Sequence, residues 1–253
     1  MIEQYINKII NADCIDILKL LPSKSIDLIL TDPPYGLNYN NGNDLAGQRE
    51  KVFGGDITRQ SSREILNDGK EEALELFINF LKEAKRILKK GACCCCCCCG
   101  GGGKQPLFAK WSLLMDEIIG FNHAVVWDKG GLGMGMQWRR TYEFILIAQD
   151  GNTFHRWNGG KKECNILRQG RFNKIIPTEE QHTTEKPVRL FEYFIKLYSN
   201  ENDLILDCFS GSGTTAIASY NLNRNFICIE KDKDYYEKSV KCLENVKSQT
   251  RIF

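Results

Sequence analysis

The stretch Asp32-Pro33-Pro34-Tyr35 combines groups suited to chemistry on a flat ring that carries an amine. A carboxylate and a proline carbonyl both accept hydrogen bonds, so together they can hold the two N–H groups of an exocyclic NH2. An aromatic side chain beside them can stack on adenine or cytosine. Proline and aspartate also favour ordinary turns, which leaves a purely structural role open. These four residues are the candidate catalytic residues.

A second constellation, Asp207–Thr215, lies near the other end of the chain. Its glycines let the backbone approach a ligand closely, and Glu230 ends the next apolar run, where an acidic residue can accept hydrogen bonds from a ribose. The glycine pattern also matches the dinucleotide fingerprint, so NAD is a competing cofactor. Nothing else in the chain serves hydride transfer, whereas Asp32–Tyr35 suits alkylation of an amine. The two motifs together favour S-adenosylmethionine.

Alternating strands and helices are predicted to position both motifs. Apolar runs predict strands at 27–31, 93–99, 124–127, 144–148, 204–207 and 226–230, with a short strand or extended lead-in at 5–10. Helical spacing and stop signals predict helices over 14–21, 71–88, 106–119, 187–198, 214–221 and 234–246. This alternation predicts an α/β fold with a doubly wound, mostly parallel sheet.

The order of these motifs resembles that of the permuted, beta-type DNA amino-methyltransferases, in which the catalytic motif comes first and the cofactor glycines come late. The resemblance covers nearly the whole chain and implies a Rossmann-like methyltransferase fold. It implies that Asp13, in Ala12-Asp13-Cys14, contacts the adenine of S-adenosylmethionine, and that Thr183 and Lys186 lie near its methionine end. A charge at a helix start is the alternative role for Lys186. The candidate cofactor-binding residues are Asp13, Cys14, Thr183, Lys186, Asp207, Phe209, Ser210, Gly211, Ser212, Gly213, Thr214, Thr215 and Glu230.

The resemblance also implies the reaction, which is methylation of the N6 amine of adenine in double-stranded DNA. Asp at the head of the catalytic motif, here Asp32, is commoner in the adenine enzymes of this family than in its cytosine N4 enzymes. Methylation of cytosine at N4 is the runner-up, because either amine fits the same acceptors. Because a duplex hides the amine in base pairing, the target must be flipped into a pocket. A catalytically silent DNA-binding subunit, or methylation of RNA or protein amines, remains open.

A basic segment is the candidate DNA-binding surface. Residues 129–189 hold eleven Lys or Arg against six Asp or Glu in a chain whose net charge is only +2. This local excess of positive charge suits the binding of a polyanion, although a solvated lysine-rich surface is the alternative. Residues 129–181 are expected to form a target-recognition insert, and 1–128 with 182–253 the catalytic domain, while the polar loop 36–70 is a candidate to close over a flipped base. The candidate DNA-binding residues are Arg139, Arg140, Arg156, Lys161, Lys162, Arg168 and Arg171.

Cysteine is concentrated in one run, since seven of the twelve cysteines are the consecutive residues Cys93–Cys99. Adjacent strand residues point to opposite faces, so the run suits no single metal ion. Reduced cysteine behaves as a small apolar residue, and the sequence therefore predicts a buried strand. We expect neither a metal site nor disulfides, which are rare in reducing compartments.

The remaining composition indicates a globular protein. Hydrophobic residues make up 42% of the chain, no apolar run approaches the length of about 20 residues that spans a bilayer, and the N-terminus lacks the features of a signal peptide. We therefore expect a cytoplasmic protein with no membrane contact. The small size of the insert suggests a short recognition site or a homodimer. A cognate restriction enzyme is a further partner that the family resemblance allows.

Overall fold

The computed structural model describes residues 2–36, 69–98, 106–130, 138, 141–168 and 186–250. Within these ranges, one eight-stranded sheet has the order β1-β8-β7-β2-β3-β5-β4-β6. The pairs from β1 to β3 are parallel, β5 is antiparallel to both β3 and β4, and β6 is parallel to β4. The strands are β1 (Lys8–Asn11), β2 (Ile26–Thr31), β3 (Leu88–Cys98), β4 (Phe121–Asp128), β5 (Tyr142–Gln149), β6 (Ile166–Leu167), β7 (Leu204–Asp207) and β8 (Asn225–Glu230).

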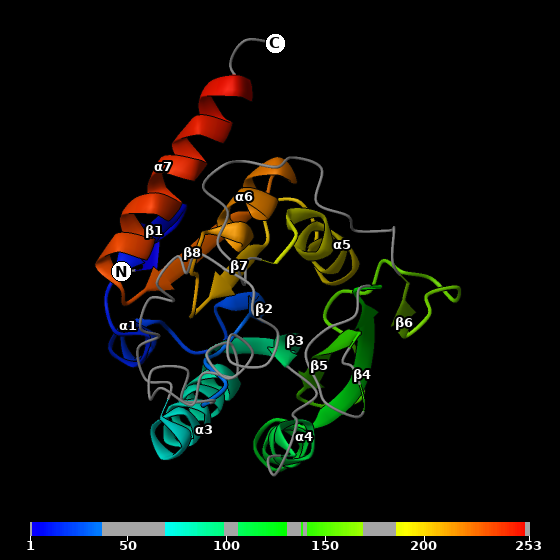
Figure 1. Cartoon of the computed structure of the whole chain (residues 1–253). Coiled ribbons are helices and arrows are strands. Elements are labelled where there is room, and N and C mark those ends of the chain that lie inside the picture. The colour runs from blue at the N-terminus through cyan, green and yellow to red at the C-terminus, as the bar shows by residue number, and fades with distance from the viewer. Residues whose placement is uncertain are drawn as a thin grey trace, which may run out of the picture.

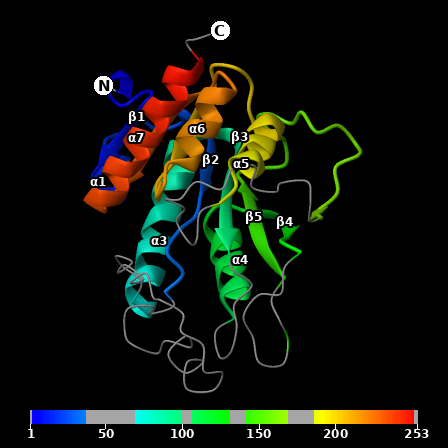
Figure 2. The same cartoon turned by 45° about the horizontal axis from the view of Figure 1, so that its top comes forward.

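Helices cover both faces of this sheet, which confirms the predicted doubly wound α/β fold (Figures 1 and 2). A short 3-10 helix, Ile2–Gln4, precedes β1. One face carries α1 (Cys14–Leu20), α3 (Lys70–Ile87) and α4 (Leu107–Ile118). The other face carries α5 (Val188–Tyr198), α6 (Thr214–Asn221) and α7 (Lys233–Thr250). No helix in the described ranges is long and apolar enough to cross a bilayer.

Several bounds of the elements differ from the sequence prediction. Strand β1 covers Lys8–Asn11 rather than 5–10, and β3 begins at Leu88 rather than at 93. Strand β4 begins at Phe121 rather than at 124, and α7 continues to Thr250 rather than ending at 246. The two-residue strand β6 was not predicted, because so short a segment shows no periodicity. The expected insert, 129–181, contains β5, which lies between β3 and β4 in the sheet. The predicted insert is therefore not one continuous segment outside the sheet, because β5 divides it into a part before this strand and a part after it.

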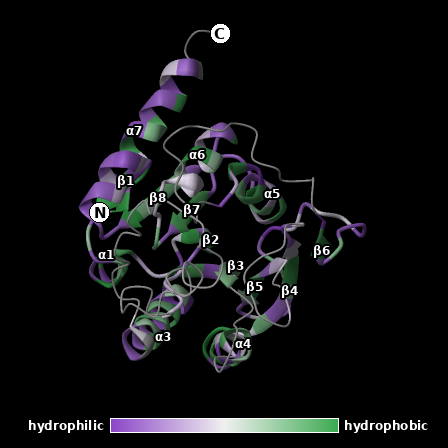
Figure 3. Cartoon of the chain, in the orientation of Figure 1, coloured by the Kyte–Doolittle hydropathy of each residue, from purple (hydrophilic) through white to green (hydrophobic). Residues whose placement is uncertain are grey.

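The described part of the cysteine run lies at the centre of the sheet, as predicted, and Cys99 lies outside the described residues. Residues 93–98 lie in β3, and all six side chains are buried. Cys94, Cys96 and Cys98 pack into the core beneath α1, α3 and α4, while Cys93, Cys95 and Cys97 pack into the core beneath α5. The strict alternation explains how one residue type serves both faces. Hydrophobic residues gather on the central strands, whereas much of α7 is hydrophilic (Figure 3).

A buried carboxylate joins three segments at the amino ends of the parallel strands. The carboxylate of Asp27, in β2, accepts hydrogen bonds from Lys89 Nζ at 2.7 and 2.8 Å and from the backbone N–H of Leu204 at 3.0 Å. It also lies 2.8 Å from His155 Nε2. Burial alone would raise the pKa of Asp27, but these partners outweigh burial and lower it. The segment around His155 is thereby fastened to the edge of the sheet where β2 begins.

Replacing Asp27 by asparagine is expected to lower the free energy of unfolding by roughly 2 kcal/mol at neutral pH, because the hydrogen bonds from Lys89 lose their charged acceptor. Since the folded pKa of Asp27 lies below its ordinary value, its stabilisation is present above about pH 4 and is lost as the pH falls through the folded pKa. Urea unfolding near pH 7 and near pH 3 measures the change. An equal deficit at both pH values would contradict the assignment, and the exposed Glu237→Gln serves as the control.

Candidate active site

The two sequence motifs meet at one edge of the sheet. Strands β2 and β7 are parallel neighbours, so the residues that follow them emerge side by side at their carboxyl ends. Thr31, the last residue of β2, donates a hydrogen bond of 2.6 Å from its hydroxyl to Asp207 Oδ1, at the end of β7. The catalytic motif and the glycine loop, 176 positions apart at this contact, are therefore joined directly.

Asp32 lies at the centre of a polar cluster just beyond β2. Its Oδ1 accepts a hydrogen bond of 2.5 Å from the Tyr35 hydroxyl, and its Oδ2 lies 2.6 Å from Lys186 Nζ. The Asp32 side chain is 26% exposed, whereas that of Lys186 is 9% exposed. Burial and the Asp32 carboxylate raise the pKa of Tyr35, which stays a neutral phenol. Burial alone would lower the pKa of Lys186, but the neighbouring carboxylates outweigh burial and raise it.

Glu143 is the second carboxylate of this cluster. It lies at the start of β5, and because β5 runs antiparallel to β3, this end of the strand reaches the same edge as Asp32. Glu143 Oε1 accepts a 2.6 Å hydrogen bond from Lys129 Nζ, and Oε2 lies 3.4 Å from Lys186 Nζ. Burial would raise the pKa of Glu143, but the two ammonium groups outweigh it and lower the pKa. Glu143 was not among the residues predicted from the sequence, although a carboxylate next to the apolar run 144–148 was a usable signal.

Asp207 anchors the loop between β7 and α6. Besides Thr31, it accepts hydrogen bonds from the Thr215 hydroxyl at 2.5 Å and from the Phe209 backbone N–H at 3.0 Å. Complete burial raises the pKa of Asp207 to about 6, although these three donors act in the opposite direction. One carboxylate thus connects the end of β2, the loop after β7 and the first turn of α6.

The glycines of this loop have different functions. Gly211 has φ +51°, and among the described atoms nothing lies within 4 Å of the place a Cβ would occupy, so a ligand can approach the backbone there. Gly213 has φ +84°, and a Cβ on it would lie 2.9 Å from the Cβ of Ser239 in α7. Gly213 therefore permits close packing of the loop against α7. Glu230 Oε2 accepts a 2.7 Å hydrogen bond from Gly211 N, so the carboxylate expected at the ribose also shapes the loop.

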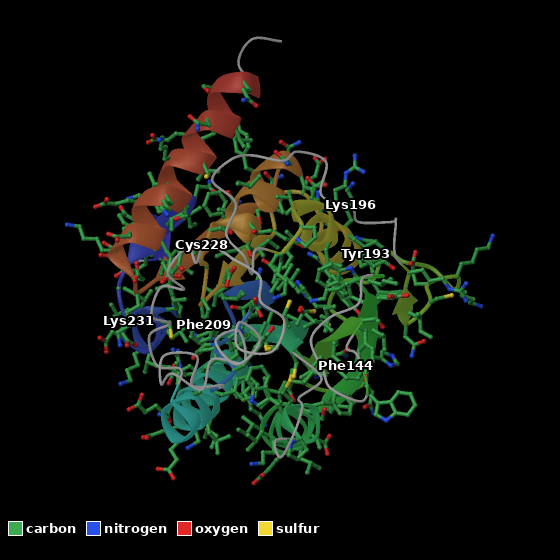
Figure 4. The ribbon with its side chains drawn as sticks, in the orientation of Figure 1. Phe144, Tyr193, Lys196, Phe209, Cys228 and Lys231 are labelled. Carbon is green, nitrogen blue, oxygen red and sulfur yellow. The ribbon has the colours of Figure 1, made fainter. Side chains whose placement is uncertain are left out.

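The other cofactor candidates surround the loop or support it. Asp13 caps α1 by accepting a hydrogen bond from Ile15 N at 2.9 Å, and it forms a 3.0 Å ion pair with Lys231, just past β8. Figure 4 shows Lys231 and Phe209 on the α1 side of the molecule and Phe144 on the α4 side. Cys14 is buried in the core, so its position fits packing. Ser210, Thr214 and Thr215 are buried within the loop and α6, Ser212 is half-buried, and Thr183 lies outside the described residues.

The DNA-binding candidates separate into two groups. Arg156 lies at the amino edge of the sheet, where it pairs with Asp203 at 3.1 Å, at the end of the strands opposite to Asp32. Arg168 is exposed and follows β6, which pairs with the last residues of β4 and so reaches the catalytic edge. Lys161 and Lys162 are exposed in the segment before β6. Arg139, Arg140 and Arg171, and the loop 36–70 except for its two ends, lie outside the described residues.

A Rossmann-like sheet with an Asp-Pro-Pro-Tyr motif and a glycine loop at one edge defines a methyltransferase of the permuted class. The family model described as DNA methylase, covering N6 and N4 enzymes, matches residues 26–241. The chain therefore belongs to the N6/N4 DNA methylase family and is a DNA methyltransferase.

Curated relatives agree with this assignment, and solved structures agree with the fold. The chain is 28% identical to the type II methyltransferase M.HinfI of Haemophilus influenzae over 97% of the chain and 70% of that protein. It is also 28% identical to M2.DpnII of Streptococcus pneumoniae over 96% of the chain and 93% of that protein. The fold is similar to PvuII DNA methyltransferase, described as cytosine-N4-specific, with a TM-score of 0.70, 16% identity and coverage of 96% and 91%. The M1.HpyAVI–SAM complex gives a TM-score of 0.63, 24% identity and coverage of 93% and 98%.

Proposed function

We propose that this protein transfers the methyl group of S-adenosylmethionine to the N6 amine of adenine at specific sites in double-stranded DNA. The observation that carries the proposal is the Thr31–Asp207 hydrogen bond, which places the catalytic motif beside the glycine loop. The open space at Gly211 and the carboxylate of Glu230 suit the backbone contacts and ribose hydroxyls of an adenosine-containing cofactor. The solved structures of similar fold include complexes with S-adenosylmethionine.

Asp32 and Pro33 would activate the amine. The lone pair of an exocyclic amine is delocalised into its ring, so the nitrogen is a poor nucleophile. Hydrogen bonds from its two N–H groups to the Asp32 carboxylate and the Pro33 carbonyl localise that pair and hold the nitrogen in line for attack. S-adenosylmethionine supplies the methyl group, and its sulfur keeps the electron pair of the broken C–S bond. The methylated nitrogen then loses a proton, which Asp32 or water accepts. Tyr35 would stack on the ring, while Pro34 keeps the turn rigid.

The DNA would approach the edge where these residues lie. Base flipping brings the target amine to Asp32, and Arg168, together with Lys161 and Lys162, would contact phosphates beside it. In this proposal the segments of 129–181 outside β5 recognise the target, while 1–128 and 182–253 carry catalysis. A homodimer that shares recognition, and a restriction enzyme of the same specificity, are the protein partners that we propose.

The target base can be determined directly. The purified protein is incubated with isotopically labelled S-adenosylmethionine and duplex DNA from cells that lack DNA methylases, and the nucleosides are then separated by mass spectrometry. Label in N6-methyladenine is the expected result. Label in N4-methylcytosine would show that the target base is cytosine rather than adenine. Transfer only to RNA or protein in parallel reactions, or no transfer at all, would overturn the proposed substrate.

A further inference from the structure

Both oxygens of the Asp32 carboxylate are engaged in this structure. The Tyr35 hydroxyl donates to Oδ1, and the Lys186 ammonium lies against Oδ2 at 2.6 Å. A cation at that distance draws electron density from the carboxylate that must polarise the amine. Methylation also moves positive charge onto the amine nitrogen, and a second cation in contact with Asp32 opposes that change. Transfer is therefore favoured by an arrangement in which Lys186 lies further from Asp32 when the base is bound.

Glu143 offers a second acceptor for the same ammonium. Its Oε2 is buried and receives no hydrogen bond from the described residues, although Lys186 Nζ lies only 3.4 Å away. Its Oε1 is held by Lys129 at 2.6 Å, which fixes the carboxylate with Oε2 facing Lys186. Buried acceptors without donors are rare, so an acceptor in this state next to an ammonium is suited to receiving it. If the Lys186 ammonium moved by less than about 1 Å, its ion pair with Glu143 would become a hydrogen bond.

We propose that Glu143 is a positioning residue that takes over the Lys186 ammonium when the target amine occupies Asp32. Lys186 thus alternates between two carboxylates, and it need not enter solvent or the path of the base. The inference rests on the proposed methyl transfer and adds a role for two residues beyond the catalytic motif. Asp32, Glu143, Lys129 and Lys186 carry two negative and two positive charges, so the exchange leaves the net charge of the cluster unchanged.

Glu143→Gln tests this role because the amide keeps the shape of the side chain and removes its charge. With Lys186 left on Asp32, the single-turnover rate of methyl transfer is expected to fall by about ten-fold or more. The dissociation constant for S-adenosylmethionine should change by less than about two-fold, since Glu143 acts on the step after binding. Glu143→Asp, which keeps the charge but withdraws it from Lys186, should recover part of the rate.

Glu83→Gln is a matched control. Glu83 is 23% exposed, is paired with Arg86 at 2.7 Å, and lies in α3 away from the cluster, whereas Glu143 is 17% exposed. Its replacement should leave the rate within about two-fold of the wild type. A Glu143→Gln protein that transfers methyl groups at the wild-type rate would overturn the inference while leaving the proposed function in place. A wild-type protein that transfers no label would overturn the proposed function itself.

A double variant separates positioning from a general structural effect. If Glu143 acts through Lys186, Glu143→Gln should change the rate by less than about two-fold when Lys186 is already methionine. The same ten-fold loss in both backgrounds would show that Glu143 acts independently of Lys186 and would refute the proposal. If the Lys186→Met protein transfers no label, the test of the proposal is the comparison of Glu143→Asp with Glu143→Gln. Equal losses of rate in those two variants would refute the proposal.

Discussion

Asp32→Ala is expected to abolish methyl transfer while the protein stays folded and still binds S-adenosylmethionine. The Asp32 side chain is partly exposed and bonds to Tyr35 and Lys186, so its loss does not open the core. The amine would lose its charged acceptor, and removal of one such electrostatic contact commonly costs about 100- to 1,000-fold in rate. The glycine loop is held by Asp207 rather than by Asp32, so the cofactor site should persist.

Three measurements check this expectation. Single-turnover transfer of labelled methyl groups gives the rate, calorimetry gives the affinity for S-adenosylmethionine, and thermal unfolding shows that the variant is folded. Asp32→Asn is the control for charge, because the amide retains one acceptor oxygen and should keep more activity than alanine. Appreciable methylation by Asp32→Ala would remove Asp32 from the reaction.

The sequence predicted the strands that end at Asp32 and Asp207 well because the signals there are local. Apolar runs before Asp32 and Asp207 are long enough to indicate buried strands, and each run ends in a motif with a clear chemical purpose. The cysteine run was also predicted correctly, because a small apolar side chain suits a strand that is buried on both faces. The order of the motifs, which resembles that of the family, implied the Rossmann-like fold, whereas the order of the strands in the sheet came from the structure.

The contacts between distant segments were not visible in the sequence. Lys186 was expected near the methionine end of the cofactor, whereas its contact in the structure is with Asp32, 154 positions earlier. Arg156 was expected to bind DNA because it lies in a basic segment, yet it pairs with Asp203 at the other edge of the sheet. Local charge does not show which edge a loop will reach, since that depends on tertiary packing. Asp27 and Glu143 each lie beside or within an apolar run, and a charged residue in that position indicates a buried ion pair.

Asp207→Ala is expected to have the largest effect on stability of any substitution considered. It would leave two buried hydroxyls, those of Thr31 and Thr215, and the N–H of Phe209 without their acceptor. Each unpaired buried donor costs about 1–3 kcal/mol, so the total loss should exceed roughly 3 kcal/mol. Because these donors shape the loop between β7 and α6, affinity for S-adenosylmethionine should fall with stability.

Asp207→Asn separates the acceptor role of this residue from its charge. The amide oxygen can still accept from Thr31 and Phe209, so stability should stay within about 1 kcal/mol of the wild type near pH 7. Burial raises the pKa of Asp207 to about 6, above the ordinary value of about 3.9. A raised carboxyl pKa means that its contribution is fully favourable below about pH 4 and is lost as the pH rises through about 6. The asparagine variant lacks this titration, so its stability relative to the wild type should increase between about pH 4 and pH 6 and level off above about pH 7.

Thermal unfolding between about pH 4 and pH 8, together with calorimetric titration of S-adenosylmethionine, distinguishes the two variants. Equal destabilisation by alanine and asparagine would mean that the charge of Asp207, rather than its acceptor oxygens, holds the loop. That result would contradict the hydrogen-bond geometry on which the junction between β2 and β7 depends. The expected result is that asparagine is tolerated and alanine is not. In that case Asp207 contributes to stability mainly by accepting three hydrogen bonds, which outweigh the cost of burying its charge.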